Sequence, residues 1–188
     1  MLRLDCLRSV YPDLENCLVV TIMGAVAAEL QSLGHRANFF YLQHAMGLAS
    51  STGLGLALCL PDQTVIVFDG DGSLLMNLGS LATIGLTQPP NLTLVVMDNE
   101  SYATTGGQAT PTAHGADLAA AARAMRIADA VTVTTDEELR RALGGSTRPA
   151  RRPTFVLAKV AESKPTAKPP LDAVAIKERF MRAIGSGA

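Results

Sequence analysis

The sequence has few aromatic residues and almost no net charge. Tryptophan is absent and Phe, Trp and Tyr make up 4% of the 188 residues, so the core has to be built from Leu, Val, Ile and Ala. Sixteen Lys and Arg residues stand against seventeen Asp and Glu residues, so the chain lacks the basic surplus that attracts nucleic acids and anionic membranes. We therefore expect small-molecule or protein partners, and neither nucleic acid nor a membrane.

Cysteine is also scarce. Cys6, Cys17 and Cys59 lie far apart, with no CxxC pair and no histidine at metal-ligand spacing, which argues against a disulfide framework or a zinc site. The first residues are broken by charges and contain no apolar signal-peptide core. The longest apolar stretch, "AMGLASSTGLGLALCLP", is too short for a membrane span and is diluted by small polar residues. We expect a cytoplasmic protein.

The apolar content, 48% of the chain, gathers in short continuous runs. Runs at 17–22, 64–68, 92–98, 130–134 and 154–160 do not alternate with polar residues, as is typical of parallel strands that are covered on both faces. Segments with helical patterns lie between them, at 24–32, 46–59, 73–86, 117–126 and 136–144. The alternation predicts an α/β fold with a doubly wound, mainly parallel sheet and helices on both faces.

The C-terminal part differs in composition. "AESKPTAKPPLDA" is rich in Pro and Lys and predicts an extended arm, and "DAVAIKERFMRAI" carries apolar residues at helical spacing. We therefore divide the chain into one domain over residues 1–161 and an arm with a final helix over residues 162–188.

Polar residues follow two successive predicted strands. Asp71 stands between two glycines in "FDGDGSLLMNLGSLATIG", and Asn99 follows the next strand, 28 positions later. A βαβ unit brings both positions to the same edge of the sheet, where open α/β sheets bind ligands. A carboxylate, an amide oxygen and a backbone carbonyl form an oxygen set that suits Mg²⁺. The metal would supply the counter-charge that a partly buried Asp71 needs.

The residues around Asp71 favour a diphosphate beside the metal. Gly70 and Gly72 permit backbone conformations closed to other residues and let a ligand approach closely. Ser73 stands at the expected N-cap of a helix that begins at residue 74, whose free N–H groups attract anions. A plain turn at "DG" and a helix cap at Asn99 are the alternatives, and the spacing of the two motifs favours the ligand site over them.

These segments resemble a known family. "GDGSLLMNLGSLATIG" followed by "NLTLVVMDNESYATTGGQ" is similar to the GDG-to-Asn motif of thiamine diphosphate enzymes, and most similar to sulfopyruvate and phosphonopyruvate decarboxylases. The resemblance runs from about Leu4 to Val160. It implies that Asp71, the side chain of Asn99 and the backbone carbonyl of Ser101 bind Mg²⁺.

The resemblance also implies a cofactor site. Gly72 and Ser73 would hold the diphosphate, and Thr104 would lie where the loop passes the diphosphate and the thiazolium ring. In "FFYLQHAMGLASSTGLGLAL", Met46 would hold the cofactor in its bent shape, while backbone groups of His44 and Met46 would bond the pyrimidine. An ordinary core methionine is the alternative for Met46. The expected cofactor-binding set is completed by Gly24, Gly70 and Tyr102.

Two positions depart from the family's pattern. His44 stands where related chains have glycine, and it either reaches the reacting carbon as an acid, base or substrate contact or points away. Ala27 and Ala28 replace polar and basic residues, and an alanine can hold neither a sulfonate nor a phosphonate. The sequence therefore predicts a small 2-oxo acid as substrate and leaves its distal group open.

One catalytic group is missing from the chain. Family members activate the cofactor with a glutamate from a separate pyrimidine-binding domain, and this chain has room for one domain. Glu29 and Glu100 belong to segments on the diphosphate side and are not expected to reach the pyrimidine. We expect a pyrimidine-binding, alpha-type partner subunit to supply the glutamate, in a hetero-oligomer that decarboxylates a 2-oxo acid to an aldehyde and CO₂.

Three other functions remain open at this point. A thiamine diphosphate carboligase of the acetolactate synthase type would differ in its products from a panel of 2-oxo acids. A nucleotide-binding module is suggested by "GLGLAL", but no strand precedes these glycines, and close helix packing explains them better. A non-catalytic subunit would be expected to have lost Asp71 or Asn99, and both are present.

Overall fold

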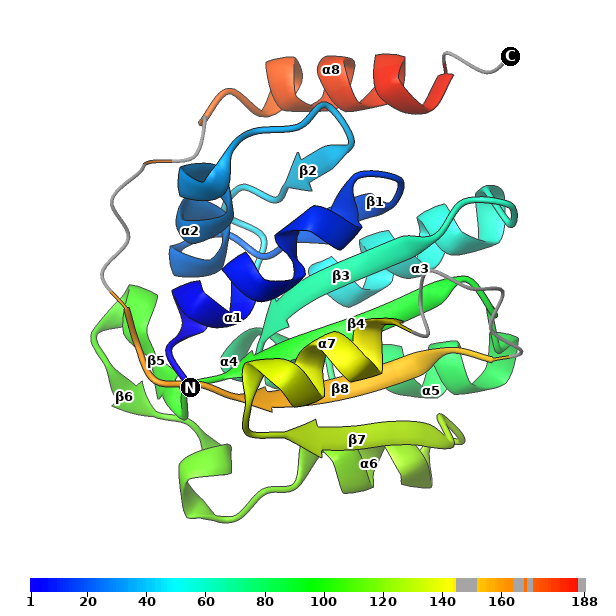
Figure 1. Cartoon of the computed structure of the whole chain (residues 1–188). Helices are drawn as coiled ribbons and strands as arrows, with labels where there is room; N and C mark the ends of the chain where they lie inside the picture. The colour runs from blue at the N-terminus through cyan, green and yellow to red at the C-terminus, as the bar shows by residue number, and fades with distance from the viewer. Residues whose placement is uncertain (145–151, 164–167, 169–170, 186–188) are drawn as a thin grey trace.

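Six parallel strands form one sheet in the computed structural model, which describes residues 1–144, 152–163, 168 and 171–185. In chain order these strands are β1 (Leu18–Thr21), β2 (Phe39–Tyr41), β3 (Val65–Gly70), β4 (Leu92–Asp98), β7 (Asp129–Val133) and β8 (Thr154–Lys159). Across the sheet they lie in the order β2-β1-β3-β4-β8-β7 (Figure 1). The order runs outward in two directions from β1 and β3, so the sheet is doubly wound, as the sequence predicts.

The central strands are buried on both faces. Every residue of β1 and all seven residues of β4 are buried, which is why these strands read as continuous apolar runs. Phe68 of β3 pairs with Thr21 of β1 on one side and with Val95 of β4 on the other. This register brings the carboxyl ends of β1, β3 and β4 to the same edge of the sheet.

Helices cover both faces of the sheet (Figure 1). One layer holds α1 (Arg3–Val10), α2 (Ala25–Leu33) and α7 (Asp136–Gly144). The opposite layer holds α3 (Ala49–Cys59), α4 (Asp71–Met76), α5 (Ser80–Thr87) and α6 (Leu118–Ala124). Among the described residues, no helix is long and apolar enough to cross a membrane.

Three sequence expectations about these elements are wrong in detail. The helix expected over 73–86 is two helices, α4 and α5, which are separated at Asn77–Gly79. The helix expected over 46–59 begins only at Ala49, so Met46 lies in the turn before it. The sequence reading also missed α1 and β2, because eight and three residues carry too little periodic signal.

The glycines of "GLGLAL" have a packing role at one of their two positions. A Cβ on Gly53 would lie 2.1 Å from Cγ2 of Val67, so α3 can lie against β3 only with a glycine there. Gly55 meets nothing within 4 Å and faces outward. Close packing thus explains Gly53, and the nucleotide-loop alternative loses its main support.

The chain after β8 returns to the body of the protein. Ala161 forms a bridge with Leu2, and α8 (Ala173–Gly185) packs against β2 with Ile176 and Phe180 buried. The final helix is therefore where the sequence predicts it. Part of the expected extended arm, residues 164–167 and 169–170, lies outside the described residues, and the boundary at 161 stays a prediction.

Candidate functional site

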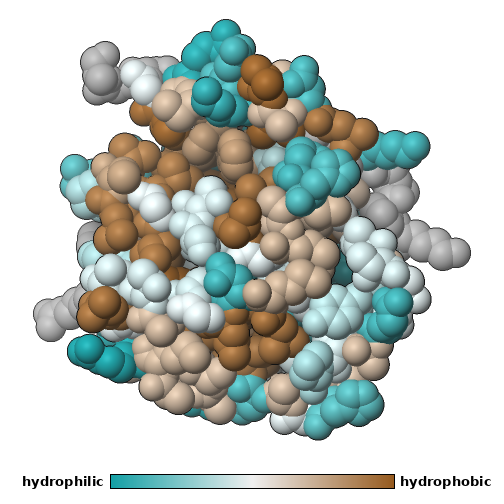
Figure 2. Space-filling view, turned by 180° about the vertical axis from the view of Figure 1, so that it is seen from behind, coloured by the Kyte–Doolittle hydropathy of each residue, from teal (hydrophilic) through white to brown (hydrophobic). Residues whose placement is uncertain are grey.

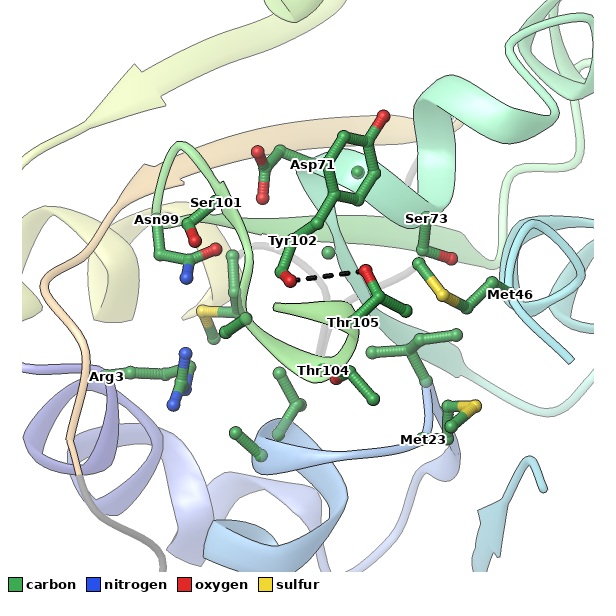
Figure 3. Close-up of a pocket in the computed structure, with 17 residues that line it drawn as sticks. Arg3, Met23, Met46, Asp71, Ser73, Asn99, Ser101, Tyr102, Thr104 and Thr105 are labelled. Carbon is green, nitrogen blue, oxygen red and sulfur yellow. Dashed lines mark hydrogen bonds between the residues drawn. The ribbon is translucent and has the colours of Figure 1, made fainter. Parts of the chain in front are cut away.

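A small cavity opens at the carboxyl ends of β1, β3 and β4, beside the point where the strand order reverses. Its volume is about 70 Å³, and it is lined by the segments that follow all three strands (Figure 3). The lining includes most of the predicted cofactor residues, namely Met46, Gly70, Asp71, Gly72, Ser73, Asn99, Ser101, Tyr102 and Thr104. Gly24 lies next to Thr104, and His44 does not line the cavity. The fold thus gathers nearly the whole predicted set.

Asp71 is the buried acid of the cavity. It is the first residue of α4 and is 1% exposed. Burial raises the pKa of its carboxyl, while a hydrogen bond from Thr110 acts in the opposite direction. Thr110 Oγ1 donates to Oδ2 of Asp71 at 2.5 Å, and Thr112 Oγ1 lies 3.2 Å from the same oxygen.

Asn99 directly follows β4. Its Nδ2 donates a hydrogen bond to Oε1 of Glu162 at 2.8 Å. Because the nitrogen is turned to Glu162, the amide oxygen faces the other way, and Figure 3 shows it on the side of Asp71 and Ser101. The expectation that positions 71 and 99 meet at one edge of the sheet is therefore confirmed.

The cations near the cavity are already paired. Lys159 bonds Asp98 at 2.8 Å and also contacts Glu100, while Arg3 pairs with Glu29 at 2.8 Å. Among the described residues, none forms an ion pair with Asp71. A buried carboxylate without a counter-charge is costly, so the chemistry of this site fits an added cation.

The donor atoms fit a hard metal ion. No cluster of three or more His, Cys, Asp and Glu side chains occurs among the described residues, so a zinc-type site is not present there. The set at the cavity is one carboxylate, one amide oxygen and backbone carbonyls, which is the oxygen chemistry of Mg²⁺ with space left for phosphate or water oxygens.

Ser73 has a different position from the one expected. Helix α4 begins at Asp71 with Gly70 as its N-cap, so the expectation that Ser73 caps a helix from residue 74 is wrong. Its hydroxyl instead accepts a hydrogen bond from the N–H of Gly47 at 2.9 Å. It also bonds Asp69, whose pKa burial raises to about 6. Ser73 thus ties the turn before α3 to α4.

The two glycines beside Asp71 matter because they lack side chains, and not because they adopt unusual backbone angles. Neither Gly70 nor Gly72 has a positive φ, which corrects the expectation of a special conformation there. A Cβ on Gly70 would meet nothing within 4 Å, so a ligand can approach its backbone. On Gly72 a Cβ would lie 2.4 Å from the Tyr102 ring, so the ring packs directly on the first turn of α4.

The segment before α3 forms one rim of the cavity. Met46 lines the cavity and is partly buried (Figure 3). His44 is exposed and has φ 50, which lies in the left-handed region that favours glycine. This backbone requirement accounts for the glycine of the family's pattern, and the role of the His44 side chain stays a prediction.

A hairpin forms the opposite rim. It consists of β5 (Ser101–Tyr102) and β6 (Gln108–Ala109), joined by the short helix η2 (Ala103–Thr105). Thr105 Oγ1 donates to the carbonyl of Tyr102 at 3.4 Å, the contact dashed in Figure 3. Oγ1 of Thr104 lies 2.9 Å from the position of a Cβ on Gly24, so the hairpin also closes on the end of β1.

The two glutamates that the sequence offers as candidates for a pyrimidine contact, Glu29 and Glu100, both form ion pairs. Glu29 is fully buried and binds Nε and Nη2 of Arg3, and the hydroxyl of Ser163 donates to it as well. Glu100 contacts Lys159. Both carboxylates are therefore paired with cations of this chain, and whether either could reach a pyrimidine ring stays a prediction.

Sequence reasoning missed four residues that touch the site. Thr110 and Thr112 bond Asp71, Glu162 holds Asn99, and Arg3 lines the cavity from the N-terminal helix. Glu162 lies 63 residues from Asn99, and Arg3 is similarly far from Asp71, so no local pattern could have marked them. The threonines follow the hairpin at a two-residue spacing, "TPT", which was visible but carries no signal by itself.

Comparison with protein families gives one match to most of the chain. Residues 21–158 match the family described as "Thiamine pyrophosphate enzyme, C-terminal TPP binding domain". The matched range holds all strands of the large sheet except the first three residues of β1 and the last residue of β8, together with the cavity residues from Met23 to Thr105.

Curated relatives match over different shares of their length. The sulfopyruvate decarboxylase subunit beta of Methanocaldococcus jannaschii is 36% identical over 183 residues, which are 97% of this chain and 96% of the relative. The phosphonopyruvate decarboxylase of Streptomyces viridochromogenes is 45% identical over 109 residues, which are 57% of this chain and 27% of the relative.

Among solved structures, a thiamine diphosphate-dependent 4-hydroxybenzoylformate decarboxylase from Rhodococcus jostii RHA1 superimposes with a TM-score of 0.72 at 17% identity. The superposition covers 87% of this chain and 33% of that structure's chain, so the present chain spans about a third of that protein. This likeness shows that the two proteins share a fold.

Proposed function

The chain belongs to the thiamine pyrophosphate enzymes, as their C-terminal TPP binding domain, and on that premise we propose that it is the diphosphate-binding, beta-type subunit of a two-subunit decarboxylase. The substrate is a small 2-oxo acid of the sulfopyruvate or phosphonopyruvate kind, and the products are an aldehyde and CO₂. The cofactors are thiamine diphosphate and Mg²⁺.

One observation carries the proposal. The match to a subunit named beta covers 97% of this chain and 96% of the relative, whereas the matched part of the phosphonopyruvate decarboxylase is 27% of that protein. A match over nearly the whole of a chain named as a subunit supports a division of the site between two polypeptides here.

In this proposal the chain holds the diphosphate end of the cofactor. Asp71, the amide oxygen of Asn99 and the backbone carbonyl of Ser101 bind the metal, while backbone groups of Gly70 and Gly72 face the diphosphate. Glu162 keeps the amide of Asn99 turned so that its oxygen faces Asp71. When bound, thiamine diphosphate supplies the electron sink that a 2-oxo acid needs in order to lose CO₂.

The rims of the cavity orient the rest of the cofactor and limit the access of water. Met46 supports the bend of the cofactor, and the backbone of residues 44 to 46 faces the pyrimidine. Tyr102 and Thr104 cover the opposite side from the hairpin. His44 is at the outer end of the same turn, where its side chain is the one acid-base group of the chain that we assign to the substrate side.

The activating glutamate comes from an alpha-type partner subunit. Two observations support this assignment. Glu29 and Glu100 are both paired with cations of this chain. The cavity of about 70 Å³ is also far below the roughly 300–1,000 Å³ of ordinary ligand pockets, so a second chain has to complete the site.

The surface around the cavity rim suits a protein partner. Figure 2 shows the layer of α3 to α6 from outside, with apolar surface spread over it. Four large apolar side chains on or next to these helices are exposed, namely Leu48, Leu58, Met76 and Leu86. Apolar surface of this kind marks interaction sites, and the Cβ of Met76 lies 3.3 Å from the position of a Cβ on Gly47, in the turn that forms the rim.

Cofactor titration tests the proposal. Thiamine diphosphate and Mg²⁺ are titrated calorimetrically into the chain with and without its co-purified partner, with Asp71→Ala as the control, and products are analysed from a panel of 2-oxo acids. We expect tight binding and aldehyde formation only in the complex, and loss of both with Asp71→Ala. Unchanged binding by that variant would reject the metal site, and carboligation products would favour the acetolactate synthase type.

The proposed location is the cytoplasm. The three cysteines are free thiols, with Cys6 and Cys17 buried and Cys59 exposed, which supports a reducing compartment.

A further inference from the structure

Asp71 is held by two hydroxyl groups that come from a different part of the chain. Oγ1 of Thr110 donates to Oδ2 of Asp71 at 2.5 Å, and Oγ1 of Thr112 lies 2.8 Å from Oγ1 of Thr110 and 3.2 Å from the same carboxylate oxygen. Thr110 is 0% exposed and Thr112 is 6% exposed. Both contacts fall on one oxygen of the carboxylate.

The same pair connects Asp71 to a second acid. Thr112 Oγ1 lies 2.8 Å from Oδ1 of Asp98, and Oδ2 of Asp98 is paired with Lys159 at 2.8 Å. Asp98 therefore has its counter-charge within the chain, whereas Asp71 is paired with no cation among the described residues. The threonines form the polar contact between a balanced carboxylate and an unbalanced one.

The hydroxyl of Thr110 does not cap the helix that follows it, although Thr110 stands at the N-cap position. Thr110 is the N-cap of the short helix η3 (Pro111–His114), and threonine at an N-cap commonly accepts a hydrogen bond from a free N–H of the first turn. Here no side-chain cap bond is formed, and the hydroxyl is directed at Asp71 instead. Local helix capping therefore does not explain this residue.

We propose that Thr110 and Thr112 are positioning residues for the metal-binding carboxylate, and this inference rests on the proposed function of Asp71. By donating to Oδ2, the hydroxyl of Thr110 fixes the rotation of the carboxylate and leaves Oδ1 to face the cavity as the metal ligand, while the hydroxyl of Thr112 holds that of Thr110 in place. They also stabilise the charged form of a buried acid before the metal arrives, since a hydrogen bond to a charged group is stronger than one between neutral groups.

The test measures Mg²⁺ affinity rather than turnover. Mg²⁺ is titrated calorimetrically, at saturating thiamine diphosphate, into the complex of the full chain with its co-purified partner. Thr110→Val removes the hydroxyl at nearly constant volume, and Thr110→Ser restores a hydroxyl on a smaller side chain. Thr21→Val is the matched control, because Thr21 is also 0% exposed and its hydroxyl has no hydrogen-bond partner.

We expect Thr110→Val to weaken Mg²⁺ binding about tenfold, Thr112→Val to weaken it less, and Thr110→Ser to stay within about threefold of the unchanged chain. Thr21→Val should bind Mg²⁺ normally. The melting temperatures of the four metal-free variants should not follow the order of their Mg²⁺ affinities. A purely structural role would instead lower the melting temperature and leave the Mg²⁺ affinity of the folded site unchanged.

Two results would overturn the inference. Normal Mg²⁺ affinity in Thr110→Val, with normal affinity in the unchanged chain, would show that the hydroxyl does not position Asp71. Equal losses in Thr110→Val and Thr110→Ser would assign the effect to packing. Failure of the unchanged complex to bind Mg²⁺ and thiamine diphosphate would instead reject the proposed function, and this inference with it.

Discussion

Asp71 is a buried acid directly after a central strand, where an added cation would offset the free-energy cost of burying its charge. Position and charge together explain why this residue, rather than the neighbouring Asp69 or Asp98, is the one we assign to the metal. Asp98 is paired with Lys159, and Asp69 bonds Gly70 and Ser73. All three acids lie near strand ends, and Asp71 is the one of the three that lines the cavity.

Ser73 is the residue whose role the structure changes most. The sequence suggests a helix cap beside the diphosphate, and the structure directs the hydroxyl to the N–H of Gly47 instead. The contact fixes the turn that carries Met46 relative to α4. Its loss leaves a buried N–H without a partner.

We therefore expect Ser73→Ala to lower the free energy of unfolding by about 1–3 kcal/mol, since a buried donor would lose its acceptor. Cofactor affinity in the complex should fall with it, because the turn at residues 44 to 47 loses its anchor. Chemical denaturation and calorimetric titration measure the two effects. Ser51→Ala serves as the control, since Ser51 is exposed and accepts only from Asn77.

At the scale of elements, the contact between α3 and β3 decides how close the turn at residues 44 to 47 lies to Gly70, Asp71 and Gly72. Helix α3 carries no charged residue, and Gly53 faces the sheet while Gly55 faces away. Helix α3 can approach β3 this closely because Gly53 has no side chain. Position 53 is therefore structural, although it lies in a glycine-rich stretch that resembles a phosphate loop.

The two glycines make a matched pair for mutagenesis. We expect Gly53→Ala to lower the free energy of unfolding by about 1–3 kcal/mol, because its Cβ would overlap Val67 in a packed core. Gly55→Ala should raise it by up to ~1 kcal/mol, since alanine is the better helix former and the position is open. Equal effects of the two substitutions in thermal denaturation would contradict this account of the packing.

At the scale of the whole molecule, the chain presents an incomplete site next to an apolar surface. Among the described residues, the one acid that lines the cavity is Asp71, which we assign to the metal, and exposed Leu48 and Met76 flank the rim at Gly47. Both features have the same explanation if a partner subunit covers this side of the protein. Strand β7, at one edge of the sheet (Figure 1), also exposes Val131, and none of its residues lines the cavity.

We expect Met76→Glu to prevent assembly with the partner and to leave the chain folded, because a charge would be buried in the interface and Met76 is 57% exposed in the single chain. Val131→Glu, at the far edge, should assemble normally. Size-exclusion chromatography with light scattering measures assembly, and circular dichroism checks the fold. Assembly of Met76→Glu at the usual affinity would move the interface elsewhere.

The predictable part of this protein is local in origin. Buried parallel strands require continuous apolar runs, so all five predicted strands are present, and a strand that ends in Asp71 followed 28 residues later by Asn99 returns to the same edge. The short β2 and α1 were missed because their few residues show little periodicity of their own. Packing of α8 against β2 and of α7 against α1 stabilises them, and these contacts exist only in the folded chain. The split between α4 and α5 was missed for a related reason, since Asn77 bonds Gly47 across the fold.

The sequence by itself determined the doubly wound sheet, the edge at which the ligand residues meet and the oxygen chemistry of that edge. Only the tertiary structure decided which acids are already neutralised. Arg3 reaches Glu29 and Lys159 reaches Asp98 over separations of 26 and 61 residues, whereas Asp71 meets the uncharged hydroxyl of Thr110, 39 residues away. A charge is balanced by whatever lies within a few ångströms of it, and distance in space is a property of the folded chain.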